Sequence, residues 1–415
     1  MFVQFYLIKS FCVYCTLSAF ISFSLFFLAY FLFDYERKLL FIYTSGLIYR
    51  AMVKKIFFLF DPELIHNVMV GYGSFLGRLS LAKKIIRFLL LIRNPHLEQT
   101  IAGTRFRNPV GLAAGFDYNA NLTQILGSVG FGFQSIGTIT NSPYGGNPPP
   151  MLGRLPKSQS LMVNKGFKNL GAQKIIEKLE GLDFEIPLGI SIGRTNSPKL
   201  KTQKQSVQDI IEAFKQFEAS TIQNAYYELN ISCPNIIHGR NITFYPPKNL
   251  DELLRALQTI GVKKPIFIKM PIEKNNDDFL SMLKVINKYK YITGVIIGNL
   301  QKNRNDPAFD PEEVKKWKVG NFSGKPCEER SNELIKLTYE HFGKRFVIIG
   351  CGGVFSAQDA YKKIKLGASL VQLITGMIYQ GPTLISQINL ELVELLKKDG
   401  YNNVSEAVGK ENSPC

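Results

Sequence analysis

Eight short apolar segments, separated by stretches with helical character, constrain the fold more than any other feature of this chain. The segments are Val110–Ala114, Phe133–Thr138, Leu188–Gly193, Tyr227–Ser232, Pro265–Met270, Gly294–Asn299, Phe346–Cys351 and Leu370–Thr375. Helical patterns lie between them, for example at Asn249–Ile260, Asp277–Tyr289 and Ala357–Leu366. This alternation predicts an α/β fold, a parallel (β/α)8 TIM barrel over residues 100–400. A doubly wound sheet is the alternative, and the absence of a G-x-G-x-x-G turn after the first strand disfavours it.

The segment from Phe11 to Phe33 carries no charged residue. As a helix it would be roughly 35 Å long, enough to cross a bilayer. A cleaved signal peptide is the alternative, but the segment is longer than a typical signal-peptide core and no small-residue cleavage site follows. Lys9 precedes the segment, whereas Arg37 and Lys38 begin a more basic stretch after it. We therefore predict a retained transmembrane helix within residues 1–34, in a cell inner membrane or its equivalent, with the catalytic part on the cytoplasmic side.

Residues 47–95 show the pattern of short amphipathic helices. Asp61, Pro62 and Glu63 are typical of a helix start, as N-cap, first-turn proline and dipole-favoured acid. Two interpretations remain open, a helical hairpin packed on the main domain or a membrane-facing lid. Residues 401–415 form a C-terminal tail in this division of the chain.

The net charge of +17 needs a physical explanation, such as an anionic binding partner. Nucleic acid is one candidate, and a generally solvated basic surface is another. Many of the basic residues flank apolar runs, as Lys54, Lys55, Lys83, Lys84 and Arg87 do. That pattern favours an anionic membrane surface over nucleic acid.

The predicted strand ends carry glycine and polar residues at the face where barrel enzymes have their active sites. They are Ala114-Gly115, Gly137-Thr138, Asn230, Lys269, Gly298-Asn299, Gly350-Cys351-Gly352-Gly353 and Ile374-Thr375-Gly376. The last two stand where a barrel phosphate site is expected, and glycine lets backbone N–H groups approach phosphate oxygens. They predict a phosphorylated cofactor. The cysteines lack metal-ligand spacing, so no metal site is predicted.

Lys269 closes an apolar, buried-looking run. A positive charge there would stabilise a reduced flavin anion, and a structural ion pair is the alternative.

Cys233 follows a strand and precedes Pro234, which places it in a turn at the barrel mouth. An inert buried cysteine is the alternative. Its neighbours Asn230, Ser232 and Asn235 carry amide and hydroxyl groups suited to holding a planar polar ring. Because a thiol can serve as a base if its pKa is tuned below about 8.5, we favour a catalytic Cys233.

Over residues 47–409 the chain resembles the dihydroorotate dehydrogenases, and specifically their membrane-bound, quinone-linked class 2. The motifs that carry the resemblance are Asp61-Pro62-Glu63-x-x-His66, the run from Arg107 to Asp117 (Arg-Asn-Pro-Val-Gly-Leu-Ala-Ala-Gly-Phe-Asp), Gly130-Phe131-Gly132-Phe133, Asn230-x-Ser232-x-Pro234-Asn235, Ser323-Gly324-Lys325-Pro326, Ile348-Ile349-Gly350-x-Gly352-Gly353 and Gly367-Ala368-Ser369-Leu370-Val371-Gln372. The helical residues 47–95, a quinone-access domain in this reading, favour class 2 because the soluble class 1 enzymes lack such a piece.

The resemblance implies an FMN-dependent oxidoreductase that converts dihydroorotate to orotate in pyrimidine (UMP) biosynthesis. A base removes the C5 proton, hydride from C6 goes to flavin N5, and electrons pass on to a membrane quinone. The implied partners are dihydroorotate, a quinone and a lipid membrane, with no nucleic acid. The resemblance implies FMN contacts at Ala114, Gly115, Thr138, Asn230, Lys269, Gly324, Gly353, Ile374 and Thr375. It implies substrate contacts at Asn164, Phe167, Asn230, Asn235 and Asn299, quinone contacts at His66 and Arg154, and Cys233 as the base.

The chain departs from the class 2 pattern mainly in its substrate residues. Class 2 uses serine as the base, whereas Cys233 is the class 1 choice. Tyr118 replaces the lysine that follows Gly-Phe-Asp, and Val163 takes the place of a substrate asparagine, with Asn164 displaced by one position. Further departures are Ser191 for a flavin-contacting asparagine, and Gly298 and Leu300 for threonines. Two cations, Lys165 and Arg194, could compensate for the lost donors.

Two alternatives to the leading function remain open. One is a divergent FMN barrel acting on another dihydropyrimidine, and the other is a flavin-binding membrane protein without turnover. A second resemblance covers Phe11–Ala19, which is similar to the last transmembrane helix of vitamin K epoxide reductase-type proteins. There the Cys12-x-x-Cys15 pair would exchange electrons with a quinone, but with one helix present we interpret it as an anchor.

Overall fold

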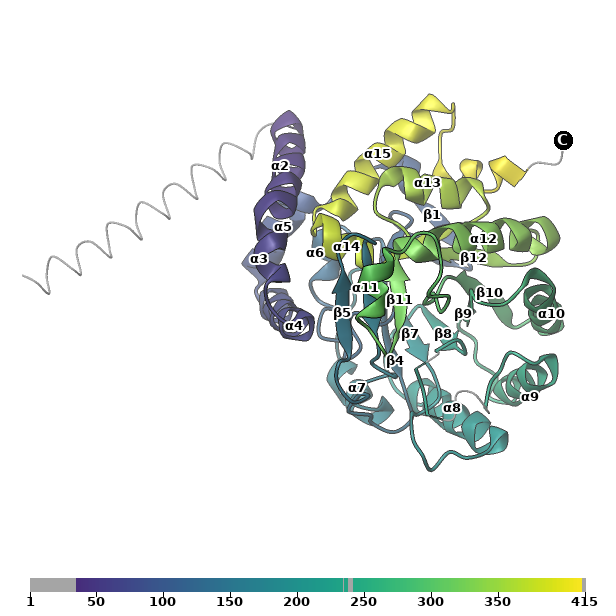
Figure 1. The fold of residues 1–415 in the computed structure, drawn as a ribbon. Coiled ribbons are helices and arrows are strands. Elements are labelled where there is room, and N and C mark those ends of the chain that lie inside the picture. The colour runs from purple at the N-terminus through teal and green to yellow at the C-terminus, as the bar shows by residue number, and fades with distance from the viewer. Residues whose placement is uncertain (1–34, 234, 238–241, 413–415) are drawn as a thin grey trace, which may run out of the picture.

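The computed structural model describes residues 35–233, 235–237 and 242–412. Eight parallel strands close into a barrel, in which β10 pairs with both β9 and β12 and so completes the ring (Figure 1). The strands are β3 (Val110–Leu112), β4 (Phe133–Ile139), β7 (Leu188–Ile192), β8 (Tyr226–Asn230), β9 (Ile266–Met270), β10 (Ile292–Ile297), β12 (Val347–Cys351) and β13 (Leu370–Leu373). All eight predicted strands are confirmed within a few residues, and the closed ring rules out the doubly wound alternative.

The barrel strands are apolar because parallel strands of this fold are covered on both faces. Strands β4, β7, β8 and β9 consist entirely of buried residues. An antiparallel hairpin of β1 (Gln99–Ile101) and β2 (Thr104–Phe106) precedes β3. It packs Phe106 edge-on against Phe133 of β4, with ring centroids 5.4 Å apart.

An outer ring of helices covers the barrel, as Figure 1 shows. The longer members are α7 (Ala172–Leu179), α8 (Gln203–Glu218), α9 (Pro247–Gln258), α10 (Asn276–Asn287), α12 (Glu328–Phe342), α13 (Ala357–Lys365) and α15 (Leu384–Lys398). The short ones are α6 (Leu126–Val129), α11 (Pro311–Lys315) and α14 (Thr375–Gln380), with 3-10 turns at Pro95–Leu97, Lys325–Cys327, Val404–Ala407 and Lys410–Asn412. The three helices named from the sequence correspond to α9, α10 and α13.

A small antiparallel sheet lies beside the barrel and was not predicted. Its order is β11 (Asn321–Gly324), β6 (Ser160–Val163) and β5 (Leu152–Leu155). Strands β5 and β6 form a hairpin, whereas β11 comes from a part of the chain more than 150 residues later. This sheet contributes wall residues to the site described below.

The N-terminal helices form a separate layer on one side of the barrel (Figure 1). They are α2 (Tyr35–Ile48), a π-helical turn (Tyr49–Val53), α3 (Lys54–Phe58), α4 (Pro62–Arg78) and α5 (Ser80–Leu90). The predicted start of α4 is confirmed, because the Asp61 carboxylate accepts hydrogen bonds of 2.9 Å from the backbone N–H groups of Glu63 and Leu64. Within the described ranges no helix is both long and apolar enough to cross a membrane. The predicted span Phe11–Phe33 and the Cys12-x-x-Cys15 pair lie outside those ranges.

Candidate active site

Two adjoining hollows at the carboxyl ends of the barrel strands, where the site was predicted from the sequence, together form the cavity. They share the wall residues Ala114, Lys269, Asn299, Leu300, Ser323, Ile374 and Thr375. One part, the glycine half, is bounded by Gly324, Gly352, Gly353 and Gly376. The other, the loop half, is bounded by His66, Tyr118, Val163, Lys165, Phe167, Cys233 and Asn235. All nine residues predicted to contact FMN line this cavity.

The glycine half leaves no room for side chains at its turns. Gly353 has a φ of +75°, and a Cβ there would lie 2.3 Å from the Glu328 Cβ. A Cβ on Gly376 would lie 1.9 Å from the Val354 carbonyl oxygen. Such turns bring backbone N–H groups to the cavity surface, which is the arrangement that binds phosphate. The hydroxyls of Thr375 and Ser323, 2.8 Å apart, add further donors at the same place.

Lys269 is the next-to-last residue of β9 and lies in the wall shared by both halves. Its side chain is buried, and among the described residues it makes no hydrogen bond or ion pair. The structural ion pair considered from the sequence is therefore not found in that part of the chain. A buried ammonium without a carboxylate suits a site for an anionic group.

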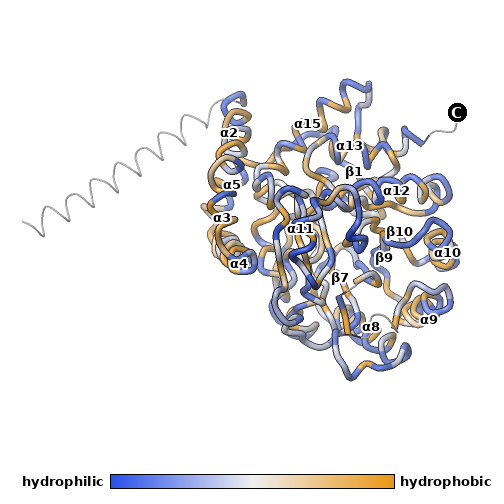
Figure 2. The backbone as a smooth tube through the Cα atoms, viewed as in Figure 1, coloured by the Kyte–Doolittle hydropathy of each residue, from blue (hydrophilic) through white to orange (hydrophobic). Residues whose placement is uncertain are grey.

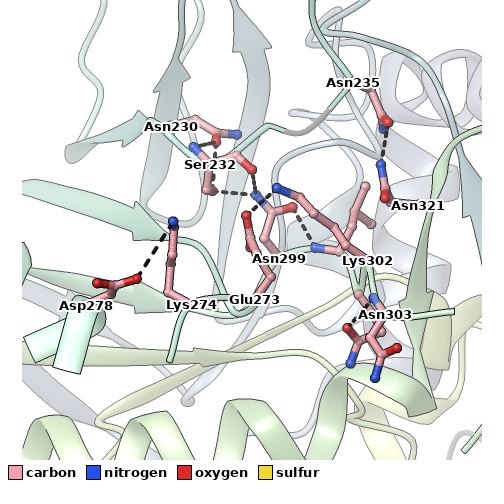
Figure 3. Close-up of polar contacts among 12 residues, drawn as sticks. Asn230, Ser232, Asn235, Glu273, Lys274, Asp278, Asn299, Lys302, Asn303 and Asn321 are labelled. Carbon is pink, nitrogen blue, oxygen red and sulfur yellow. Dashed lines mark hydrogen bonds and ion pairs between the residues drawn. The ribbon is translucent and has the colours of Figure 1, made fainter. Parts of the chain in front are cut away.

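A chain of side-chain hydrogen bonds holds the asparagines at the centre of the cavity (Figure 3). Asn230 donates to the Thr138 hydroxyl at 2.8 Å, and its carbonyl oxygen accepts from the Ser232 backbone N–H at 3.2 Å. Asn299 donates to the Ser232 carbonyl at 3.1 Å and to the Ser232 hydroxyl. These bonds fix the orientation of Asn230 and Asn299 before any ligand arrives.

The Cys233 thiol lines the loop half and is half-buried. Burial raises the pKa of Cys233 to about 11, and the Asn235 backbone and the charges of Lys302, Arg194 and Lys269 only partly oppose this. The sequence-based expectation of a pKa tuned downward is therefore wrong. At neutral pH the thiol is protonated.

Asn235 anchors the loop that carries Cys233. Its amide donates to the Val163 carbonyl at 2.8 Å, and its side-chain oxygen accepts from Asn321 at 2.6 Å (Figure 3). Asn147 donates to the Asn235 carbonyl at 2.9 Å. The loop is thus fastened to both β6 and β11 of the small sheet.

The two remaining predicted substrate residues differ in position. Phe167 lines the loop half, whereas Asn164 does not. Asn164 accepts a 3.0 Å hydrogen bond from Asn147, and its amide donates to the Pro150 carbonyl at 3.4 Å. Val163, which precedes it, occupies the cavity wall instead. The position of Asn164 does not support the predicted contact with the substrate.

The two predicted quinone residues also differ. His66, on α4, lines the cavity and stacks on Tyr118 with ring centroids 5.5 Å apart. Burial, helped by the charges of Lys165 and Lys168, lowers the pKa of His66 to about 3, so its ring is neutral. Arg154 is not among the cavity-wall residues; it donates to the Phe60 carbonyl at 2.6 Å and fixes the turn between α3 and α4.

Several functional positions were missed from the sequence. Asn147 and Asn321 bind Asn235 across 88 and 86 residues of chain, and no local pattern could have linked them. Glu63 and Lys168 form an ion pair of 2.9 Å at the edge of the loop half. Lys165, noted only as one possible compensating cation, is buried in the wall, where burial lowers its pKa to about 8.

Comparison with known proteins identifies the family. A family model described as dihydroorotate dehydrogenase matches residues 96–396. A "Dihydroorotate dehydrogenase (quinone)" of Nocardia farcinica is 32% identical over 370 residues, covering 87% of this chain and 97% of that protein. A protein of the same description from Trichormus variabilis is 34% identical, covering 85% and 94%.

A solved structure of ligand-free DHODH from Eimeria tenella matches with a TM-score of 0.75 and 27% identity, covering 85% of this chain and 100% of that one. The range matched by the family model begins at residue 96 and so does not support the second resemblance, at Phe11–Ala19. A family model over most of the barrel, together with relatives similar over nearly their whole length, establishes the relationship. This chain belongs to the dihydroorotate dehydrogenase family.

Proposed function

We propose that this protein is a quinone-dependent dihydroorotate dehydrogenase, which oxidises dihydroorotate to orotate with FMN in pyrimidine biosynthesis. The observation that carries the proposal is the composition of one cavity. It brings together all nine predicted FMN residues, Cys233, Asn230 and Asn299, and is reached on one side by His66 of the N-terminal helices. The relatives named above carry the same activity in their descriptions.

The residues of the cavity fit FMN. Gly353, Gly376 and Thr375 would hold its phosphate, and the unpaired ammonium of Lys269 would face the electron-rich edge of the ring. When bound, FMN supplies a two-electron acceptor for hydride.

The protein's own residues would orient the substrate and move its proton. Asn230 and Asn299, held by Thr138 and Ser232, would bind the polar edges of the substrate ring. Cys233 would take the C5 proton at Sγ, in its thiolate form. Because the pKa of Cys233 is raised to about 11, only a small fraction is thiolate at neutral pH, and catalysis should strengthen as pH rises.

Quinone access would run between the N-terminal helices and the barrel. His66 on α4, with Leu152 and Leu161 of the small sheet and Ile378 of α14, makes that side of the cavity mostly apolar. The neutral ring of His66 suits an uncharged quinone. Arg154, which fixes the turn before α4, would support this passage from outside the wall.

The N-terminal layer would lie on a membrane. All but four of the exposed large hydrophobic side chains in the described residues lie between Leu40 and Phe88, and the four others are Leu170, Leu182, Ile237 and Val319. Figure 2 shows apolar stretches along α2, α3 and α4. A soluble protein seldom exposes so large an apolar surface without a partner. With a transmembrane helix at Phe11–Phe33, this surface would place the barrel at the cytoplasmic face.

The test uses the full chain solubilised in detergent. Purified protein should contain FMN, dihydroorotate should bleach the flavin under anaerobic conditions, and a short-chain quinone should restore its absorbance. Failure to bleach would exclude dihydroorotate as substrate. Bleaching without reoxidation by quinone would exclude only the quinone.

A second candidate is an FMN oxidoreductase acting on another dihydropyrimidine. It is favoured by the position of Asn164 outside the cavity and by Tyr118 within it. Dihydrouracil tested in the same bleaching assay separates the two. Faster bleaching by dihydrouracil than by dihydroorotate would support this candidate.

A further inference from the structure

Among the described residues, the wall of the loop half includes several basic side chains and no carboxylate. Its charged or titratable basic wall residues are His66, Lys165, Lys168 and Lys269. His66 is neutral, and Lys168 is paired with Glu63 at 2.9 Å. Lys269, near the end of β9, lies in the wall shared with the glycine half, where it would serve the proposed cofactor. Among the described wall residues of the loop half, this leaves Lys165 as the cation with no role yet.

Lys165 is buried, with 9% of its surface exposed. Its ammonium is inaccessible and has no hydrogen-bond partner among the described residues. In the part of the chain that the structure describes, its ion-pair partner is Glu63, which is 4.0 Å away and already bonded by Lys168. On another side Lys165 lies 4.7 Å from the centre of the Tyr118 ring. A charge so poorly compensated in a buried wall is unfavourable unless an anion enters the cavity beside it.

The turn that carries Lys165 is tied directly to the loop that carries Cys233. Val163, two residues before Lys165, accepts the hydrogen bond of Asn235. Gly166, the next residue, accepts at 3.0 Å from Asn196, which in turn accepts at 2.7 Å from the Ile237 backbone N–H. Two separate bridges therefore hold the lysine turn against the loop of the proposed base.

We infer that Lys165 binds the carboxylate of the substrate and sets the preference for an acidic dihydropyrimidine over a neutral one. The inference rests on the proposed function, because dihydroorotate is distinguished from dihydrouracil by that carboxylate. The ring of the substrate would face Asn230 and Asn299 while its carboxylate meets the Lys165 ammonium, which Glu63 compensates only at 4.0 Å. Tyr118, packed between Lys165 and His66, would separate this anion site from the apolar quinone side.

The test compares Lys165→Met with the matched control Lys215→Met, which removes a lysine of α8 that is paired with Glu212 at 3.0 Å and lies outside the cavity wall. Binding of orotate and of its uncharged methyl ester to the FMN-loaded protein is measured by the change in flavin absorbance. A charge-assisted contact should make K165M lose roughly 10- to 100-fold in orotate affinity, with methyl ester affinity little changed. K215M should bind both ligands almost as the wild type does. K165R should recover part of the orotate affinity, and it replaces K165M if that variant loses FMN.

The outcomes separate the two proposals. If dihydroorotate fails to bleach the wild type and orotate fails to bind it, the proposed function is wrong and this inference falls with it. If the wild type bleaches but K165M binds orotate as tightly as the wild type, only the role of Lys165 is overturned. Equal weakening of orotate and methyl ester, or a change confined to the KM for quinone, would also overturn it.

Discussion

The two halves of the cavity are built differently, and the difference separates the part that would hold the cofactor's phosphate from the part that would select the substrate. The glycine half is made by barrel strand ends and the turns that follow them, such as those at Gly353 and Thr375. The loop half is made by residues from α4, the small sheet and the Cys233 loop, which are joined through side chains such as Asn235 and Asn147. A turn that requires glycine tolerates few substitutions, whereas contacts made through side chains can be made by other side chains. The departures from the class 2 pattern at Tyr118, Val163 and Cys233 lie in the loop half alone, whereas Leu300 lies in the shared wall and Gly298 in the glycine half.

The largest effect should come from removing the proposed base. Cys233→Ala should slow flavin reduction by dihydroorotate by about 10²- to 10⁴-fold, the usual contribution of a general base, while the protein keeps its FMN. Stopped-flow absorbance measures the rate, and FMN content is read from the same spectrum. Cys233→Ser is the matched variant and should retain more activity than the alanine. An alanine variant that reduces flavin at the wild-type rate would remove Cys233 from the chemistry.

A glycine substitution should disrupt FMN binding in the glycine half and leave Cys233 unchanged. Gly353→Ala places a Cβ 2.3 Å from the Glu328 Cβ, so the purified protein should lose most of its FMN. Gly181→Ala is the control, because Gly181 has the same φ of +75° but nothing within 4 Å of the added Cβ. Gly181→Ala should be destabilised by about 1–2 kcal/mol in thermal or chemical unfolding, the cost of the left-handed backbone, and Gly353→Ala by more, because its Cβ also clashes with Glu328. If both variants retain FMN equally, the glycine half does not hold the phosphate.

The pH dependence of flavin reduction should follow the ionisation of the Cys233 thiol. Because burial raises the pKa of Cys233 to about 11, the active thiolate increases as pH rises and is scarce below that value. The rate should therefore rise by up to about tenfold per pH unit between neutral and mildly alkaline conditions, and the rise should be absent in Cys233→Ala. Pre-steady-state rates at a series of pH values decide this. A plateau reached by pH 7 would mean that the bound state lowers the thiol pKa far below its value in the free protein.

The smallest effect should come from loosening the junction between the lysine turn and the base loop. Asn196→Ala removes bonds to Gly166 and Ile237, and each such bond is worth about 1 kcal/mol. Flavin reduction should slow by roughly 5- to 10-fold with FMN content unchanged. Gln216→Ala serves as the control. It removes the hydrogen bond that Gln216 donates to Asn141 on the outside of the barrel, and it should leave the rate unaltered. Equal rates in the two variants would show that the junction does not position Cys233.

The barrel could be predicted because its strands are buried on both faces and are therefore continuous apolar runs. The glycine half followed, since its residues sit directly at the ends of those runs. The small sheet could not be predicted: Leu152–Leu155 and Ser160–Val163 are short, and their partner Asn321–Gly324 is far away in the chain. For the same reason the sequence did not reveal that Val163, and not Asn164, faces the cavity. The direction of the Cys233 pKa depends on burial by distant segments, which no local pattern encodes.

We propose that the cavity at the barrel mouth holds FMN and that dihydroorotate is oxidised there. The most direct measurement is an anaerobic titration of the FMN-loaded protein with dihydroorotate, followed by flavin absorbance. We expect bleaching that is complete near one equivalent of substrate per flavin, with orotate released in the same amount. A flavin that stays oxidised with excess dihydroorotate, in protein that retains its FMN, would contradict the account.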